Sequence, residues 1–390
     1  MRTMRNTLQT IRASEAGFSL VELMIAAFIF GIITSAAFSL VAQNAPIYTQ
    51  QQNQAALNIG MRNAVAQIQE DLVNGGSGYY NGINVPNWPV SVAISNNVIS
   101  SSGDCHSGTT YTSQCFDSLA AIIVDPNTTP VNLSADGTKI TCYAAGNCGV
   151  ATGITCTGPG ACTGNTVSTT GSQIYVLPPA GVTAATYANS FGNGDHLMLV
   201  TNSGSLYTEV TLTAAGTTQV VSGTTYVLLT HTATNGDGSN SATNDPTGMS
   251  TYTSSVLSST YDPTCWVARL TPVVYSVDTT TDSTNPTLKR TLLTGTTTTA
   301  SGVPLVNQII GFKIGASLPG SATGVYYFDS SNYPNPPASP YNYPAIRSVM
   351  VSLVGRTNPN LSNPFVNSFD GGHYQIQGVS VVVTPRNSLF

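Results

Sequence analysis

Charge is scarce in this chain. Asp, Glu, Lys and Arg make up 7% of the 390 residues, whereas roughly a quarter is typical of a soluble domain. There are 12 Lys and Arg residues against 17 Asp and Glu residues, which gives a formal net charge of −5. So few cations form no basic surface for phosphate contacts, and we therefore expect no direct binding of nucleic acid.

Residues that carry out catalysis are scarce too. The four histidines, His106, His196, His231 and His373, do not stand at metal-binding spacings. The chain has no Gly-x-Ser-x-Gly, His-Glu-x-x-His or phosphate-loop sequence. The carboxylates are also too few to suggest a glycosidase pair. We therefore predict that the protein is not an enzyme.

One long apolar run is present instead, from Phe18 to Ala42, and it contains a single carboxylate, Glu22. As a helix this run would extend about 37 Å, which is enough to cross a bilayer. It is too long for the core of a secretory signal peptide. A simple membrane anchor would explain the length but not Glu22, because an acid inside a membrane helix costs about 2.5–3.5 kcal/mol. We therefore expect Glu22 to have a charged partner or a specific function.

Residues 17–26 read Gly-Phe-Ser-Leu-Val-Glu-Leu-Met-Ile-Ala. This sequence resembles the cleavage and N-methylation motif of type IV prepilins and type II secretion pseudopilins. The resemblance implies that a prepilin peptidase cuts between Gly17 and Phe18 and that the new amine of Phe18 is methylated. It also implies that Glu22 neutralises the Phe18 amine of a neighbouring subunit during filament assembly.

The resemblance further implies partners and a location. The partners would be other pilins or pseudopilins, which pack through the N-terminal helix, and the peptidase itself. The mature chain would be held in the inner membrane by one span, with its domain in the periplasm, and would then enter a pilus or pseudopilus at the cell surface. The basic residues Arg2, Arg5 and Arg12 would keep the leader on the cytoplasmic side.

The pattern along the chain predicts an α+β fold. We expect a leader over residues 1–17, a membrane helix over 18–42, an amphipathic continuation of that helix over 43–76, and a β-rich globular domain over 77–390. Pro46 is expected to kink the helix or loosen a turn. An apolar stripe at spacings of three and four indicates that the second half of the helix lies on a sheet; it consists of Leu57, Met61, Ala64, Val65, Ile68 and Leu72.

Short apolar or alternating runs predict eleven strands after residue 78. They are Leu119–Val124, Ile174–Leu177, His196–Val200, Tyr207–Leu212, Tyr226–Leu229, Trp266–Leu270, Val273–Val277, Leu288–Leu293, Ile309–Ile314, Val349–Val354 and Gln375–Val383.

The last third of the chain resembles PilW-like minor pilins and the J-type pseudopilins of type II secretion. The resemblance rests on Leu288-Lys289-Arg290, on the stretches 303–314 and 346–357, and on the end of the chain from Val379 to Asn387. The length of the chain and the lack of cysteine after Cys265 indicate a minor subunit rather than a major pilin. We therefore expect a minor pilin that enters or primes a type IV pilus-like filament.

Two alternatives remain open. One is a subunit of a type II secretion pseudopilus. The other is an adhesin at a pilus tip that binds through Tyr- and Thr-rich loops. Tyr326-Tyr327-Phe328 and Tyr341-Asn342-Tyr343 are the aromatic segments in question, and they are equally consistent with aromatic cover on the sheet.

Six of the seven cysteines lie close together in the sequence. If the domain is exported, it lies in an oxidising compartment, and we expect these cysteines to form disulfides. Because fifteen pairings are possible, the connectivity is open, but short loops favour neighbours. The absence of a Cys-x-x-Cys pair argues against zinc. Cys265 is expected to be a buried thiol. The favoured pairs are Cys105 with Cys115, Cys142 with Cys148, and Cys156 with Cys162.

No cofactor is expected. Calcium is the one metal with any support, because Asp237, Asn240 and Asp245 place hard oxygen ligands in a Gly-rich segment. The same residues are typical of a solvated turn, which is the simpler interpretation.

Overall fold

The structure is a computed structural model of the whole chain. It describes residues 19–76, 91–97, 106–107, 110–132, 141–142, 148–149, 173–200, 207–221, 224–231, 266–293, 302–317, 324–328, 346–359, 366–367 and 371–385.

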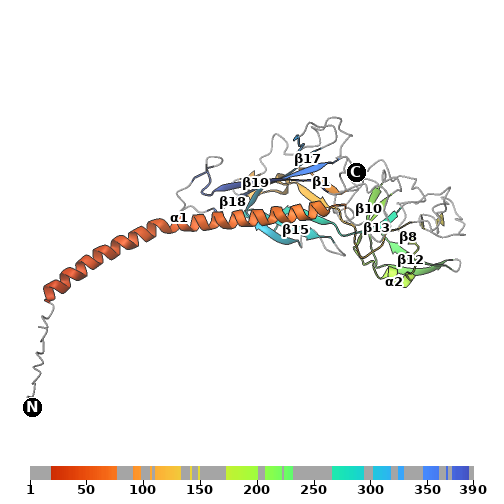
Figure 1. Cartoon of the computed structure of the whole chain (residues 1–390), viewed down its shortest axis with the longest axis horizontal. Coiled ribbons are helices and arrows are strands. Elements are labelled where there is room, and N and C mark those ends of the chain that lie inside the picture. The colour runs from red at the N-terminus through yellow and green to blue at the C-terminus, as the bar shows by residue number, and fades with distance from the viewer. Residues whose placement is uncertain are drawn as a thin grey trace, which may run out of the picture.

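One helix, α1 (Leu20–Asn74), dominates the molecule. Its first half projects away from the rest of the chain in a gentle curve, and its second half lies along the globular part (Figure 1). The helix continues through Pro46, so this residue does not break it. Beyond Asn74 the chain turns at Gly75, and the amide of Gly76 donates to the carbonyl of Ile122.

Two antiparallel sheets enclose the second half of α1. The first has the strand order β1-β4-β14-β15-β16, and the second has the order β17-β18-β19. The helix packs against β4, β16, β18 and β19, and so contacts both sheets. Their strands are β1 (Val92–Ser95), β4 (Ser118–Ala121), β14 (Val273–Asp278), β15 (Thr287–Leu292), β16 (Val303–Asn307), β17 (Ile309–Ser317), β18 (Ser348–Arg356) and β19 (Ile376–Val383).

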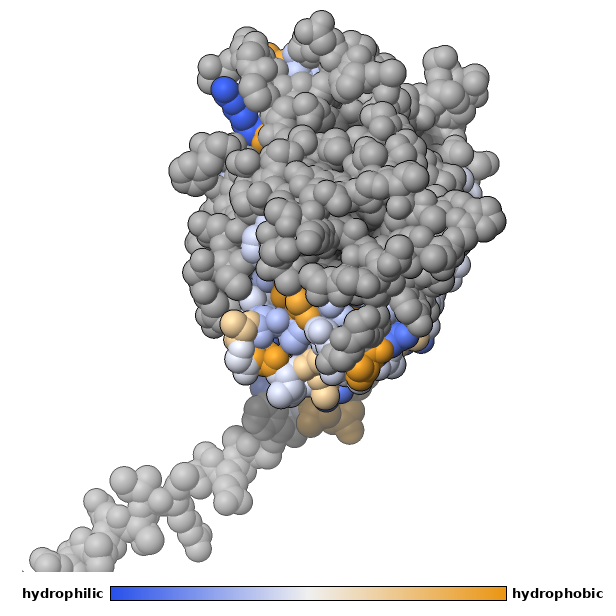
Figure 2. Space-filling model, turned by 90° about the vertical axis from the view of Figure 1, so that its right-hand side faces the viewer, coloured by the Kyte–Doolittle hydropathy of each residue, from blue (hydrophilic) through white to orange (hydrophobic). Residues whose placement is uncertain are grey.

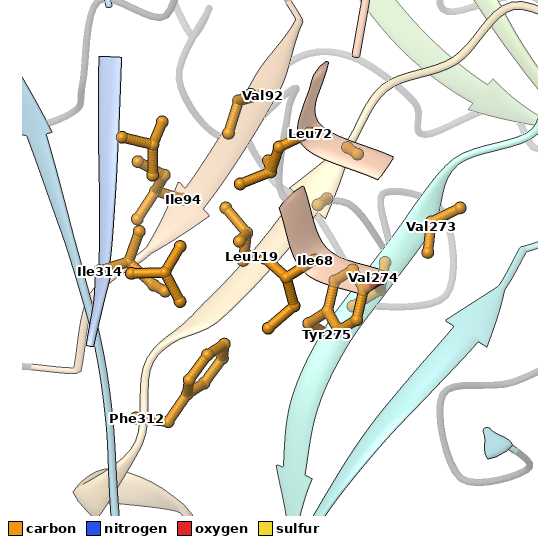
Figure 3. Close-up of a cluster of buried hydrophobic side chains, with 14 of the residues drawn as sticks. Ile68, Leu72, Val92, Ile94, Leu119, Val273, Val274, Tyr275, Phe312 and Ile314 are labelled. Atoms are coloured by element: carbon orange, nitrogen blue, oxygen red, sulfur yellow. The ribbon is translucent and has the colours of Figure 1, made fainter. Parts of the chain in front are cut away.

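The main apolar core lies between α1 and these two sheets. Figure 3 shows Ile68 and Leu72 of α1 pointing toward Leu119 and Tyr275, with Ile314 on the second sheet. All five side chains are fully buried. The predicted apolar stripe of α1 therefore faces the sheets, and the predicted α+β class is confirmed.

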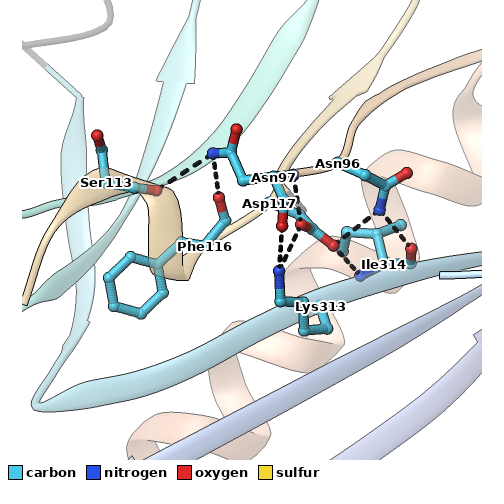
Figure 4. Close-up of polar contacts among 7 residues, drawn as sticks. All are labelled: Asn96, Asn97, Ser113, Phe116, Asp117, Lys313 and Ile314. Carbon is cyan, nitrogen blue, oxygen red and sulfur yellow. Dashed lines mark hydrogen bonds and ion pairs between the residues drawn. The ribbon is translucent and has the colours of Figure 1, made fainter. Parts of the chain in front are cut away.

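A buried carboxylate joins the two sheets. Asp117, which precedes β4, accepts bonds from the amide of Ile314 at 2.8 Å and from Nζ of Lys313 at 3.0 Å, both on β17. It also accepts from the side chain of Asn96 at 2.9 Å and from the amide of Asn97 at 3.0 Å (Figure 4). Because Asp117 is 1% exposed, these donors replace water around its charge.

A second lobe lies at the end of the molecule far from the start of α1 (Figure 1). It contains one sheet of order β10-β9-β13-β5 and another of order β11-β12-β8-β7-β6. The elements are β5 (Val131–Asn132), β6 (Thr141–Cys142), β7 (Cys148–Gly149), β8 (Gln173–Val176), α2 (Ala184–Ala188), β9 (His196–Val200), β10 (Tyr207–Thr211), β11 (Thr217–Val221), β12 (Thr224–Thr230) and β13 (Trp266–Leu270). Before β4 the chain forms β2 (His106–Ser107), β3 (Thr110–Tyr111) and the 3-10 helix η1 (Ser113–Cys115), and Tyr111 lies against Arg356 at the end of β18.

Candidate functional site

The start of α1 is held by a reciprocal cap that includes Glu22. The Ser19 amide donates to Oε2 of Glu22 at 3.1 Å, and the Ser19 hydroxyl accepts from the Val21 amide at 3.4 Å. This capping box satisfies backbone donors that otherwise have no partner in the first turn. The Glu22 carboxylate also faces the positive end of the helix dipole. In this uncut chain, Glu22 therefore has a local backbone partner.

The surface that follows Glu22 is apolar and uncovered. From Leu23 to Met61 the chain has no charged residue, and the next charge is Arg62. Large apolar side chains on this part of α1 are exposed, for example Phe28 and Phe38 at 70% each. Among the described residues, α1 is the one helix long and apolar enough to cross a membrane. Such a surface is stable only in lipid or against other apolar surfaces.

Polar side chains in this half of α1 bond to the helix itself. The hydroxyl of Thr34 donates to the carbonyl of Phe30 at 2.7 Å, and the Asn44 amide donates to the carbonyl of Leu40 at 2.8 Å. The hydroxyl of Thr49 donates to the carbonyl of Ala45 at 3.0 Å. These bonds satisfy the side chains without water, as an apolar environment requires.

A shallow groove of about 600 Å³ runs along the same half of α1. Its floor has small residues at intervals of four, namely Ala27, Gly31, Ser35 and Ser39. A Cβ added at Gly31 would meet no atom within 4 Å. Small residues in this arrangement let a second helix approach closely.

An ion pair anchors the other end of α1 to the first sheet. Nε of Arg290 lies 2.7 Å from Oδ2 of Asp71, and its Nη2 lies 3.1 Å from Oδ1. The hydroxyl of Tyr275 also donates to Oδ2 of Asp71. Burial, followed by the hydrogen bond to Asp71, raises the pKa of Tyr275 well above its usual value. The hydrogen bond to Asp71 likewise raises the pKa of Arg290.

Arg356 is a buried cation, 2% exposed, at the end of β18. Its guanidinium lies between two aromatic rings, 5.2 Å from the centre of Tyr111 and 5.0 Å from that of Tyr374. Its Nε donates to Oε1 of Gln308 and its Nη2 to the carbonyl of Thr284, both at 2.7 Å. Arg290 and Arg356 both belong to the C-terminal sequences cited above, and both hold the fold together. Sequence reasoning assigned neither role, because their partners lie far away along the chain.

The predicted processing residues Gly17 and Phe18 lie outside the described residues, and so do Cys265 and the calcium candidates Asp237, Asn240 and Asp245. Within the described part of the chain, no group of three His, Cys, Asp or Glu residues is placed to hold a metal ion. The buried side chain of His196 has its Nδ1 3.2 Å from the hydroxyl of Thr211.

The prediction of a disulfide at Cys115 is wrong in this structure. Cys115 is a thiol that is 3% exposed, with its Sγ 3.9 Å from the hydroxyl oxygen of Thr112. The reason is that η1 directs this side chain into the main apolar core. Cys142 and Cys148 are directly opposite each other in the β6–β7 pair, which suits their predicted bridge. The bridge itself remains a prediction, as does that between Cys156 and Cys162; Cys105, Cys156 and Cys162 lie outside the described residues.

Comparison with protein families finds one match. Residues 12–38 fit the model of the prokaryotic N-terminal methylation motif. No curated protein matches the chain, and no solved structure matches it. The motif, the exposed apolar helix and the antiparallel sheets on its second half define a type IV pilin-like protein. The motif supports a precursor like those of pilins and pseudopilins, and it implies processing by prepilin peptidase and assembly with other pilins.

Proposed function

We propose that the protein is a minor pilin that enters or primes a type IV pilus-like filament. Prepilin peptidase cuts after Gly17, and the amine of Phe18 becomes the methylated N-terminus. Glu22 then neutralises the Phe18 amine of the neighbouring subunit, and the helix groove at Ala27, Gly31, Ser35 and Ser39 receives a neighbouring helix.

One observation supports this proposal above all. Glu22 is the single charge at the head of a helix whose next charge is Arg62, and the apolar surface between them is exposed. Its present partner is a backbone amide. An ammonium group is a stronger partner for a carboxylate in an apolar medium than a neutral donor. The contact between Glu22 and a neighbour's amine is therefore most stabilising when the helices pack together in an apolar environment.

The minor role is supported by the second lobe, which extends the molecule at the end far from the start of α1 (Figure 1). A bulky distal lobe is easier to place at a filament end than between identical copies. On the distal face in Figure 2, the described residues show separate apolar patches among polar ones.

The test is the Glu22→Ala variant in cells that make the filament. We expect it to be cut normally, because the peptidase site lies at Gly17 and Phe18, but to be missing from sheared filaments. Glu70→Ala is the matched control, because Glu70 is an exposed acid on the same helix. Gly17→Asp should leave the leader in place, seen as an unchanged mass on a blot. Normal incorporation of Glu22→Ala would contradict the proposal.

A further inference from the structure

Among the described residues, no strand pairs with the outer edge of β19. In the β18–β19 pair, Thr357 lies opposite Gln375 and its amide donates to the Gln375 carbonyl, so this is a hydrogen-bonded pair. Along an antiparallel ladder, pairs that exchange backbone hydrogen bonds alternate with pairs that do not. The backbone groups of Gln377, Val379 and Val381 therefore point toward β18. Those of Ile376, Gly378, Ser380 and Val382 point away from it.

A side-chain contact supports this register. The hydroxyls of Ser380 and Ser352 lie 3.0 Å apart. Opposed side chains are closest in pairs that do not exchange backbone bonds, which agrees with an outward-facing backbone at Ser380. The four outward residues are all exposed. Among the described residues, their outward backbone groups have one weak partner, the Gln377 side chain, which lies 3.4 Å from the carbonyl of Gly378.

The opposite edge of this sheet is closed. On β17 the outward carbonyl of Phe312 accepts from the Asp117 amide. Both outward groups of Ile314 bond to the side chains of Asp117 and Asn96 (Figure 4). Both outward groups of Ala316 bond to Tyr327. Within the described part of the chain, outward groups of Phe312, Ile314 and Ala316 thus have partners at one edge of the three-stranded sheet, whereas the other edge is exposed.

The open edge also lacks the usual protection. Edge strands are commonly blunted by charge, proline or a bulge. The sequence of β19 is Ile-Gln-Gly-Val-Ser-Val-Val-Val, which has neither charge nor proline, and its pairing with β18 is regular. A Cβ added at Gly378 would meet nothing within 4 Å, so a side chain of an adjoining strand has room there.

We propose that β19 accepts an extended, uncharged strand from a different pilin-type subunit of the same filament. This inference rests on the proposed function. The strand would extend the sheet by bonding to the outward groups of Ile376, Gly378, Ser380 and Val382. Main-chain bonds of this kind supply affinity, and side chains on alternating faces supply specificity.

A second copy of this chain does not fit the site. Two identical edges join in a regular sheet through a two-fold axis that reverses the strand direction. The start of β19 lies beside Met61 and Arg62, and β19 runs from there toward the C-terminal end of α1. Reversing β19 would therefore reverse α1. The two apolar helices would then point in opposite directions and could not enter one membrane.

The first test is hydrogen exchange at single-residue resolution, on the full chain in detergent and in isolated filaments. We expect the amides of Gly378, Ser380 and Val382 to exchange fast in detergent and at least tenfold more slowly in filaments. Those of Gln377, Val379 and Val381 should be slow in both, because they bond to β18. Fast exchange of the outward amides in filaments would overturn the proposal.

The second test uses Ser380→Pro, which removes an outward amide and leaves the bonds to β18 in place. Ser380→Ala is the control, because it removes the hydroxyl alone. We expect the amount of the Ser380→Pro subunit in sheared filaments to be at least fivefold lower than that of the wild type. The amount of the Ser380→Ala subunit should equal that of the wild type. Val382→Lys, which adds charge to the edge, should behave like Ser380→Pro and serves if the proline variant does not fold.

Comparison with Glu22→Ala separates the two proposals. Wild-type incorporation of Ser380→Pro and Val382→Lys, together with loss of Glu22→Ala, would overturn the strand-docking proposal alone. Normal incorporation of Glu22→Ala would overturn the filament mechanism.

Discussion

Asp71 shows how a single residue anchors the helix in a chain with few charges. It is 7% exposed and meets Arg290 through two bonds and Tyr275 through a third. All three residues lie where α1 meets β14 and β15. The attraction between the paired charges offsets the cost of burying them, so removing one partner leaves an uncompensated charge and is strongly destabilising.

We expect Asp71→Asn to lower the free energy of unfolding by about 3 kcal/mol, because it leaves the Arg290 guanidinium without a counter-charge. This is the low end of the range for breaking a buried ion pair, since the Arg290 side chain remains 28% exposed. Urea unfolding followed by circular dichroism measures the change. Glu70→Ala, at the adjacent exposed acid, should shift stability by less than about 0.5 kcal/mol. Equal effects of the two variants would show that the ion pair does not anchor the helix.

Tyr275 makes stability depend on pH in the alkaline range. Burial and the bond to Asp71 raise its pKa in the folded state, whereas the unfolded chain titrates near pH 10. Because the folded state then holds the proton more tightly, this contribution is complete below about pH 10 and is lost as the pH rises further. Tyr187 acts in the same direction, because burial raises its pKa as well.

We therefore expect the melting temperature to fall between about pH 9.5 and pH 11, and to fall less steeply in Tyr275→Phe, which has no phenol to titrate. Tyr48→Phe is the control, because Tyr48 is 68% exposed. A Tyr275→Phe profile parallel to that of the wild type would exclude this contribution.

At the scale of elements, the contact between α1 and β18 depends on a glycine. A Cβ added at Gly355 would lie 2.9 Å from Cδ1 of Leu57 and 3.0 Å from Sδ of Met61. The helix can therefore approach β18 only because this side chain is absent. The alternating pattern of β18 predicted the strand but gave no sign of which residue the helix would cross.

We expect Gly355→Val to destabilise the protein by about 1–3 kcal/mol, the usual cost of overpacking a core. Gly378→Ala is the matched control, because the added methyl at Gly378 meets nothing within 4 Å. Chemical denaturation of both variants measures the difference. Equal stability would mean that α1 moves away from β18 without cost.

The strands show what the sequence could predict. All eleven predicted strands are present, and His196–Val200 and Trp266–Leu270 have the predicted bounds. Among the strands missed, β16 contains Pro304, which argues against a strand except at a sheet edge, and β11 is rich in threonine rather than alternating. Strand order was not predictable, because β4 pairs with β14 across more than a hundred residues.

The candidate site likewise has some residues that the sequence could predict and others that it could not. Glu22 stood out in the sequence because it is one charge in a long apolar run. Asp117 and Arg356 did not stand out, because nothing near them in the sequence shows that they are buried. Their importance comes from partners such as Lys313 and Tyr111, which only the folded chain brings close.

At the scale of the whole molecule, one arginine ties the two lobes together. Nη1 of Arg269 on β13 lies 2.8 Å from Oδ2 of Asp125, and its Nε lies 2.9 Å from Oδ2 of Asp195. Asp125 follows β4 of the helix-bearing lobe, and Asp195 precedes β9 of the distal lobe. Both carboxylates are buried, at 5% and 3% exposure. One cation therefore serves two acids at the junction.

We expect Arg269→Met to destabilise the distal lobe by about 3–5 kcal/mol, because it leaves two buried carboxylates without their cation. The backbone and Thr128 donors to Asp125 and the Gly192 amide at Asp195 remain, but they are neutral. The helix-bearing lobe keeps its own anchors at Asp71 and Asp117, so the variant should unfold in two steps, with the distal lobe first.

Limited proteolysis should then cut the distal lobe while leaving α1 bound to its sheets. Arg62→Met is the control, because Arg62 is an exposed arginine of α1. A single unfolding transition shared by wild type and Arg269→Met would show that the lobes depend on other contacts for their union.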